Sequence, residues 1–214
     1  MLRVLFYCFG MFLIALGAVI TINANLGVSP VTSLPYVLSL VTNMDVGITF
    51  VAFYIVLIII QIILLRKNFK WINLTQILFS TVFGYFIILA EYVVGDFVIP
   101  SYPGRLLMLL VGVSVLSLGI TIYVGTKLVP VPSEGLVSAL AQLLNRPFAQ
   151  IKIAFDCTVV LCAVIISFIA FGELRGIREG TVICSILIGL MIKGYQKAVI
   201  PALNKICFEP LHGL

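Results

Sequence analysis

Two acidic residues, Glu134 and Asp156, lie in stretches of the chain that are otherwise strongly apolar. Burying an ionisable side chain in an apolar segment costs free energy, so such a residue usually marks a binding or coupling site. Structural roles are the alternative. Lys152 lies one helical turn before Asp156 and could simply pair with it, and Glu134 could cap its own helix after Pro132. We take Glu134 and Asp156 as candidate coupling residues.

Polar residues also gather in and before two proline-broken segments, 29–43 and 131–145. We expect Ser29 to be the N-cap of a helix that starts at Pro30, and Pro132 takes the same place in the second segment. Free N–H groups and the positive end of the helix dipole would then favour a polar or anionic ligand. The candidate substrate-binding residues are Asn23, Asn25, Ser29, Thr32, Ser33, Tyr123, Lys127, Ser133 and Glu134.

Sequence motifs give no sign of an enzyme. The chain has no HExxH, P-loop or nucleophile-elbow pattern, and its one histidine, His212, has no ligand partners nearby. The five cysteines form no CxxC pair, and four of them lie in apolar runs, as small buried hydrophobes do. We therefore expect no enzymatic activity, no cofactor and no metal site.

The composition is that of a membrane protein. The 214-residue chain is 62% hydrophobic and 10% charged, whereas soluble domains have about 25% charged residues. A helix needs about 20 apolar residues to cross a bilayer, and the predicted spans are 4–24, 47–65, 73–94, 104–126, 149–171 and 178–198. The linkers between them are too short for soluble domains, so residues 1–214 are predicted to form a single transmembrane domain.

Lys and Arg residues are distributed unequally between the two sides of the predicted bundle. With the N-terminus inside, ten of the 13 lie on the inner side. Since cytoplasmic loops carry the excess of positive charge, we expect a cell (cytoplasmic) membrane protein with both termini cytoplasmic. No basic-aromatic surface indicates nucleic-acid binding. The expected partners are the lipid bilayer and a small-molecule substrate, with a second copy of the chain as a further candidate.

The two halves of the chain resemble each other. A shift of 102 positions aligns residues 3–57 with 105–159 at twelve identities, which include Arg3 with Arg105 and Pro30 with Pro132. A shift of 105 then aligns Ser80 with Ser185, so the predicted repeats are 3–94 and 105–198. Because three spans per half is an odd number, the second repeat must be inverted relative to the first.

The fold predicted from this pattern is an all-α polytopic membrane protein. It has six transmembrane helices and two short Pro-initiated half-helices that re-enter the membrane, arranged as two inverted-topology three-span repeats. Non-helical backbone at membrane depth survives only inside protein or beside a water-filled cavity. Paired interrupted segments of this kind indicate a transporter's binding site near the midplane. The alternative is that both segments are surface helices at the membrane interface.

Two further sets of residues have roles in helix packing to consider. The glycines are expected to serve packing rather than chemistry, whereas for the side-chain amides lining a cavity and bonding neighbouring helices are equal alternatives. Small residues let helix backbones approach closely, and side-chain amides form hydrogen bonds between helices in a membrane. The glycines are at positions 10, 17, 84, 112, 119 and 189. The amides are Gln61, Gln76, Gln142 and Gln150.

Three stretches carry a resemblance to a known group of proteins: NLGVSPVTSLPYVLS, VPVPSEGLVSALA and GIREGTVICSILIGLMIK. They resemble the YczE/YitT group of bacterial membrane proteins and are most similar to its YczE branch. The similarity covers nearly the whole chain. It implies a permease-like layout in the bacterial cytoplasmic membrane, and it supplies no substrate and no binding residues.

The function expected from the sequence is secondary transport of a small polar, potentially anionic, metabolite bound between the two half-helix N-termini. Coupling to protons or sodium ions would drive it. One alternative is the substrate-binding membrane subunit of an ATPase-driven vitamin importer. Such subunits present a small-xxx-small face on their first helix, and the spacing of Ala15 and Ala18 does not fit that pattern. The other alternative is a membrane scaffold or regulator that transports nothing.

Overall fold

A computed structural model describes residues 2–44, 46–66, 75–95, 97 and 99–207 of the chain. Within them the helices are α1 (Leu2–Asn23), α2 (Pro30–Thr42), α3 (Val46–Leu65), α4 (Gln76–Val94), α5 (Tyr102–Gly125), α6 (Pro132–Leu143), α7 (Phe148–Phe171) and α8 (Glu179–Cys207). No strand occurs in these residues. Most of the linker between the predicted spans 47–65 and 73–94 lies outside the described residues, and so does His212.

Five of the described helices are long and apolar enough to cross a membrane. They are α1, α3 from Ile48, α5, α7 and α8. In α4 the apolar stretch with described side chains runs only from Val82 to Val94, so the span predicted at 73–94 stays a prediction. Helix α8 extends beyond the predicted span 178–198, through Pro201 to Cys207. Proline removes one backbone donor there and does not end the helix.

Helices α1 and α5 cross in close contact because glycines face each other at the crossing. A Cβ added to Gly10 would lie 3.0 Å from the carbonyl oxygen of Gly119, and one added to Gly17 would lie 2.6 Å from that of Gly112. The prediction that these four glycines serve close packing is confirmed. For Gly84 the prediction is wrong, since nothing lies within 4 Å of an added Cβ there.

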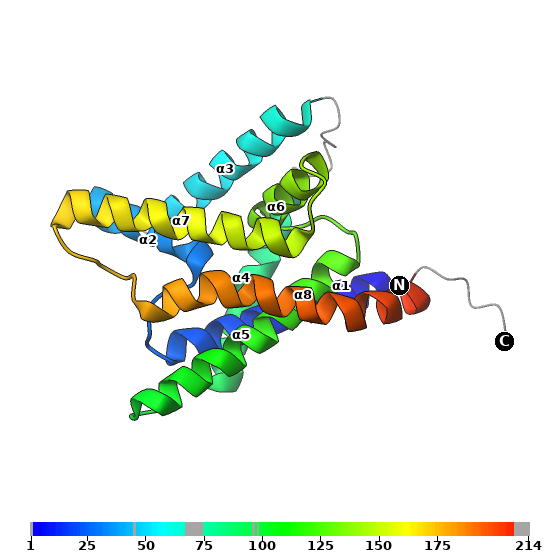
Figure 1. The fold of residues 1–214 in the computed structure, drawn as a ribbon, viewed down its shortest axis with the longest axis horizontal. Coiled ribbons are helices and arrows are strands. Elements are labelled where there is room, and N and C mark those ends of the chain that lie inside the picture. Colours follow the sequence, from blue (N-terminus) through cyan, green and yellow to red (C-terminus); the bar gives the residue numbers. More distant parts are fainter. Residues whose placement is uncertain (1, 45, 67–74, 96, 98, 208–214) are drawn as a thin grey trace.

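The two Pro-initiated helices, α2 and α6, are 13 and 12 residues long. At about 1.5 Å per residue, neither is long enough to cross an apolar core of about 30 Å. Both lie between α3 and α7, with α2 mainly against α7 and α6 mainly against α3 (Figure 1). Ser29 occupies the predicted N-cap position of α2, but its side chain makes no capping hydrogen bond. Pro30 therefore starts this helix without a side-chain cap.

The segment between α1 and α2 is held by the segment that joins α7 to α8. The N–H of Val28 donates to the carbonyl of Gly176 over 3.2 Å, and the N–H of Gly180 donates to the carbonyl of Leu26 over 2.9 Å. The Thr181 hydroxyl also donates to the carbonyl of Val28 over 2.7 Å. These bonds lie at the end of the molecule opposite the start of α1 and the end of α8 (Figure 1). These hydrogen bonds hold the segment that leads into α2 against the segment between α7 and α8 at that end, which we call the closed end.

Candidate functional site

A buried cluster of charged side chains joins α6 to α7. The Nζ atom of Lys152 lies 2.8 Å from Oδ1 of Asp156 and 3.5 Å from Oε1 of Glu134. The three side chains are 2%, 0% and 8% exposed, respectively. The pair that the sequence indicated within α7 is therefore present, and α6 adds a second carboxylate to it. We call Glu134, Lys152 and Asp156 the charge triad.

Glu134 is oriented by its neighbours rather than used as a helix cap. The Ser133 hydroxyl donates to Oε2 of Glu134 over 2.7 Å, so both carboxylate oxygens have a partner. A capping glutamate at this position would accept the N–H of Val131, the N-cap residue. That N–H donates instead to the Tyr123 hydroxyl. The capping alternative is therefore wrong.

Asp156 is only half satisfied. Its Oδ1 accepts the bond from Lys152, but its buried Oδ2 has no hydrogen-bond partner among the described residues. Leaving a buried charged oxygen unpaired is costly, so such an atom calls for a functional explanation.

The first half of the chain has no counterpart of this charge pair. At the positions that correspond to Lys152 and Asp156 it has Phe50 and Tyr54. Their rings pack edge to face, with centroids 6.1 Å apart.

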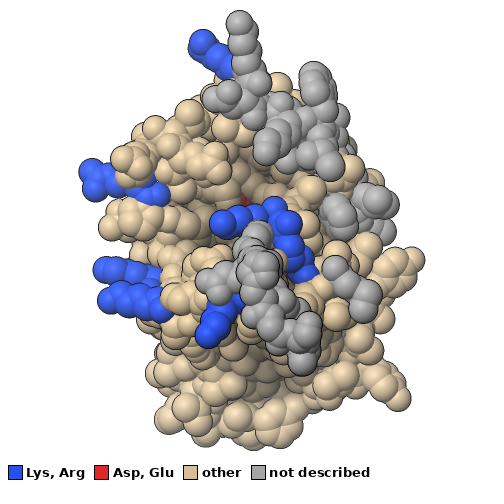
Figure 2. Space-filling view, turned by 90° about the vertical axis from the view of Figure 1, so that its right-hand side faces the viewer, with Lys and Arg blue, Asp and Glu red and all other residues tan. Residues whose placement is uncertain are grey.

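A cavity of about 1060 Å³ lies beside α6, whose residues Gly135, Ser138 and Ala139 form part of its wall. Its walls include the last residues of α3, α5 and α6, which end on the same side of the molecule as α8 (Figure 1). On that side several basic side chains lie beside a hollow in the surface (Figure 2). The polar residues that line the cavity are Gln61, Gln76, Thr121, Tyr123, Lys127, Ser138, Gln142 and Gln196.

Two glutamines both form part of the cavity wall and bond between helices, so both alternatives considered for them occur together. Nε2 of Gln76 donates to Oε1 of Gln61 over 3.1 Å, and Nε2 of Gln61 donates to the carbonyl of Pro132 over 3.0 Å. Gly135 leaves room for them, since a Cβ there would lie 2.9 Å from Oε1 of Gln61. The amides thereby fix the N-terminus of α6 against α3 and α4.

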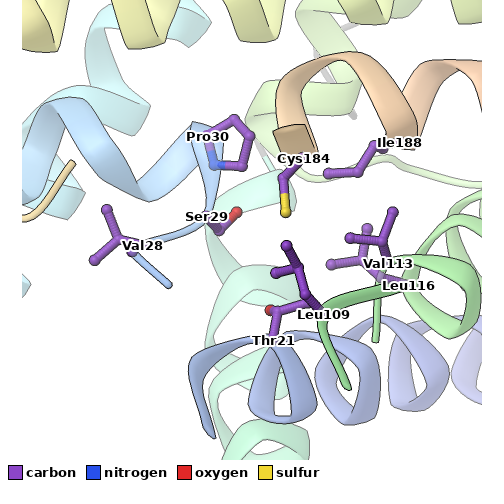
Figure 3. A pocket seen from close by; sticks show the side chains of 10 residues that line it. Thr21, Val28, Ser29, Pro30, Leu109, Val113, Leu116, Cys184 and Ile188 are labelled. Atoms are coloured by element: carbon purple, nitrogen blue, oxygen red, sulfur yellow. The ribbon is translucent and has the colours of Figure 1, made fainter. Parts of the chain in front are cut away.

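A much smaller pocket, of about 10 Å³, lies at the N-terminus of α2. The side chains of Ser29 and Cys184 face it, with Thr21 below them and apolar residues of α5 and α8 around it (Figure 3). This volume is about that of a single water-sized probe. The pocket therefore has room for a water molecule and not for a metabolite.

The nine predicted binding residues do not form one site. Tyr123 and Lys127 line the large cavity, Ser133 and Glu134 belong to the triad, and Ser29 lines the small pocket. The other four are used locally, and their bonds run as follows. Asn23 donates to the carbonyl of Gly95, Thr32 and Ser33 donate to the carbonyls of Ser29 and Pro30, and the exposed Asn25 accepts a bond from Arg178 at its own carbonyl.

Reasoning from the sequence missed several residues of these sites. Lys152 was treated only as a partner of Asp156, because nothing in the spacing shows that α6 brings Glu134 to it. Ser138 and Gln196 line the cavity and could have been found as polar residues within apolar runs. No group of three or more His, Cys, Asp or Glu side chains suited to a metal occurs in the described part of the chain.

Comparison with known proteins places the chain in a family. Over 199 residues it is 27% identical to the uncharacterized protein YyaS of Bacillus subtilis (strain 168), covering 92% of this chain and 94% of that protein. No solved structure matches the chain significantly. Residues 1–197 match a family of unknown function, DUF6198. The chain therefore belongs to the DUF6198 family.

Proposed function

We propose that the protein is a membrane transporter for a small polar solute, bound in the large cavity beside α6. The observation that carries the proposal is the cavity itself, of about 1060 Å³ and lined by eight polar side chains within a set of apolar helices. Residues 127–130, which are not helical, form part of its wall. Irregular backbone at membrane depth is tolerated where it lines a water-filled cavity.

The lining favours a neutral or anionic solute with several hydrogen-bonding groups. The lining contains four side-chain amides, two aliphatic hydroxyls, the Tyr123 hydroxyl and the Lys127 ammonium group. Gln61 and Gln76 are buried and bond to each other, so the groups exposed to a solute are Lys127, Ser138, Gln142 and Gln196. No carboxylate is among the described residues that line it. A cationic solute would therefore lack a counter-charge, whereas a carboxylate or phosphate could approach Lys127.

The pairing of elements supports the proposal of two inverted three-span repeats. Exchanging α1 with α5, α2 with α6, α3 with α7 and α4 with α8 turns the α2–α7 contact into α6–α3 and the α1–α4 contact into α5–α8, and all four contacts exist. The glycine crossing has the same property, since Gly10 faces Gly119 and Gly17 faces Gly112. In this arrangement α2 and α6 would be the re-entrant half-helices, and α4 the sixth span.

The two alternative functions are less well supported. In a vitamin-importer subunit the small residues of the first helix would face a partner protein. Here Ala15 is fully buried, in a cluster with Val19 and Ala90 of α4. A scaffold or regulator has no need of a large polar cavity. The proposal assigns the protein no bond-forming chemistry.

The place of the protein in the cell follows from the same proposal. A transporter of this kind would lie in the cell membrane, with both termini and the cavity mouth in the cytoplasm, as the basic residues of that end suggest (Figure 2). Exposed apolar residues such as Ile63 and Tyr92 would face lipid or a second copy of the chain. The resemblance to the YczE/YitT group agrees with this location and stays a prediction.

Filling the cavity tests the proposal. Ligands would first be sought by thermal shift of the purified protein against a library of small neutral and anionic metabolites, then tested for uptake into proteoliposomes. Ser138→Trp places an indole on the cavity side of α6. We expect it to weaken ligand binding at least about tenfold, or about 1.4 kcal/mol, and to abolish uptake.

Leu144→Trp provides the matched control, because Leu144 is the C-cap residue directly after the same helix, is 58% exposed and does not line the cavity. It should bind and transport like the unmodified protein. Equal loss in both variants, or full uptake in Ser138→Trp, would refute a transport site in this cavity.

A further inference from the structure

We propose that the charge triad is a proton-binding site, and that the proton resides on Oδ2 of Asp156. Its role as the coupling site rests on the proposed transport function, but proton binding itself does not. The argument starts from the number of charges. Two carboxylates and one ammonium group leave one negative charge in excess, in a cluster that is at most 8% exposed. An uncompensated charge is strongly unfavourable in such surroundings.

The geometry indicates which carboxylate takes the proton. Glu134 has a partner for each oxygen, from Lys152 and Ser133, and lies in the first turn of α6, where the helix dipole favours a negative charge. Oδ2 of Asp156 has no partner among the described residues and is fully buried. On acidification a hydronium ion gives up its proton: its O–H bond breaks to leave water, a new O–H bond forms at Oδ2 of Asp156, and the triad becomes neutral.

The other ionisable groups around the triad do not supply the missing positive charge. Tyr54 of α3 and Tyr123 of α5 interact electrostatically with Glu134, and Cys184 of α8 interacts with Asp156. All three are neutral when protonated. Helix α2 also packs against α7. Its ionisable residue is Tyr36, which is neutral when protonated and whose ring lies against Gly176, in the segment between α7 and α8. Within the described residues, Lys152 is the one cation of the site.

The position of the triad suits the transfer of a proton from one side to the other. Tyr123 lines the large cavity and interacts electrostatically with Glu134, while Cys184 lines the small pocket and interacts electrostatically with Asp156. The triad thus interacts with one lining residue of each cavity. Because it joins α6 to α7, gain or loss of the proton changes the attraction between the half-helix and the long helix beside it.

Infrared difference spectroscopy tests this in the full-length protein in lipid nanodiscs. On acidification from mildly alkaline pH, we expect a carboxylic-acid C=O band to appear. Asp45 and Asp96 are the other aspartates of the chain. In an Asp45→Asn/Asp96→Asn background, a heavy carboxyl carbon in aspartate should therefore shift the Asp156 band, and the same label in glutamate should not. This arm needs no change in the triad, so it does not depend on variants that fold poorly.

Substitutions provide the second arm. Asp156→Asn removes the proton acceptor, and Glu134→Gln removes the excess charge, so both should lose the band. Glu91→Gln, at an exposed position of α4, should keep it. A shift with labelled glutamate alone, or no titrating band at all, would overturn the proposal. Loss of the band when Na⁺ replaces K⁺ at constant pH would overturn it in favour of a sodium site.

The two proposals can fail separately. If the Asp156 band titrates but no solute is accumulated in proteoliposomes, the proton site stands and the transport function fails. If uptake occurs and ignores an imposed pH gradient while the band is absent, the transport function stands and the proton site fails.

Discussion

Lys152 is the residue on which the charge triad depends. It lies at the centre, within 3.5 Å of one carboxylate and 2.8 Å of the other. Buried ion pairs contribute little net stability, but removal of one partner leaves a buried charge that nothing compensates. The loss of stability therefore differs between the members of the triad. Removing Lys152 leaves two carboxylates without a cation, whereas removing either carboxylate leaves Lys152 paired with the other.

Lys152→Met is therefore expected to be the most destabilising single change in the triad. We expect a loss of about 3–5 kcal/mol in the free energy of unfolding, measured by denaturation in detergent. Lys197→Met removes the same charge from an exposed position of α8 and should change stability by less than about 0.5 kcal/mol. The double variant Lys152→Met/Asp156→Asn should lose less than the sum of the single losses. Strict additivity would show that the pair is not coupled.

At the scale of single residues, the sequence indicated the chemistry and not the geometry. Glu134 and Asp156 were identifiable because acids are rare in apolar segments. Their shared partner was not, since Lys152 lies 18 positions from Glu134 on another helix. Spacing rules within one helix cannot predict a contact of this kind. For the same reason Asn23 and Asn25 were grouped with the site although they bind at the opposite end.

The helices themselves were easier to predict than their partners. Proline fixed the starts of α2 and α6 at the expected residues, because it suits the first helical position and ends whatever precedes it. The contact of α2 with α7, and of α6 with α3, depends on tertiary packing. The similarity between the two halves of the sequence contains no information on which short helix lies against which long helix.

The α1–α5 crossing supplies the prediction at this scale. A methyl group on Gly119 would lie 2.7 Å from the backbone nitrogen of Ile14 and 2.8 Å from the carbonyl oxygen of Gly10. Gly119→Ala is therefore expected to destabilise the protein by about 1–3 kcal/mol. Gly84→Ala, in open surroundings on α4, should be neutral or stabilise by up to about 1 kcal/mol through helix propensity. Thermal unfolding of the two variants side by side checks the difference, and equal melting temperatures would contradict the crossing.

At the scale of the whole molecule, the two ends differ in charge and in closure. One end carries the cavity and a group of basic side chains, and the other carries the hydrogen bonds between the α1–α2 and α7–α8 segments (Figures 1 and 2). The unequal distribution of basic residues between the two ends was predictable from the sequence, because it needs only the positions of Lys and Arg relative to the predicted helices. The cavity was not, since it depends on how far α3 and α6 stand from α8.

Labelling from outside the cell tests the orientation. In a variant without native cysteines, Glu173→Cys should react with a membrane-impermeant maleimide in intact cells, because the Glu173 side chain is 62% exposed at the closed end. Arg146→Cys, exposed at the opposite end, should react only after permeabilisation. The reverse pattern would place both termini outside. Gly176, in the same segment, is a less suitable site for the labelling cysteine, because it has φ of 74° and lies against the Tyr36 ring.

The bonds at the closed end also order events during synthesis. Val28 and Thr181 are 153 positions apart, yet the carbonyl of one accepts the hydroxyl of the other. The ribosome delivers Val28 to the membrane long before Thr181 exists. Until the last hairpin is inserted, the polar backbone before α2 must find its hydrogen bonds elsewhere, in water or in the translocon. The first half of the chain therefore cannot complete the hydrogen bonds before α2 by itself, and depends on the second half to do so.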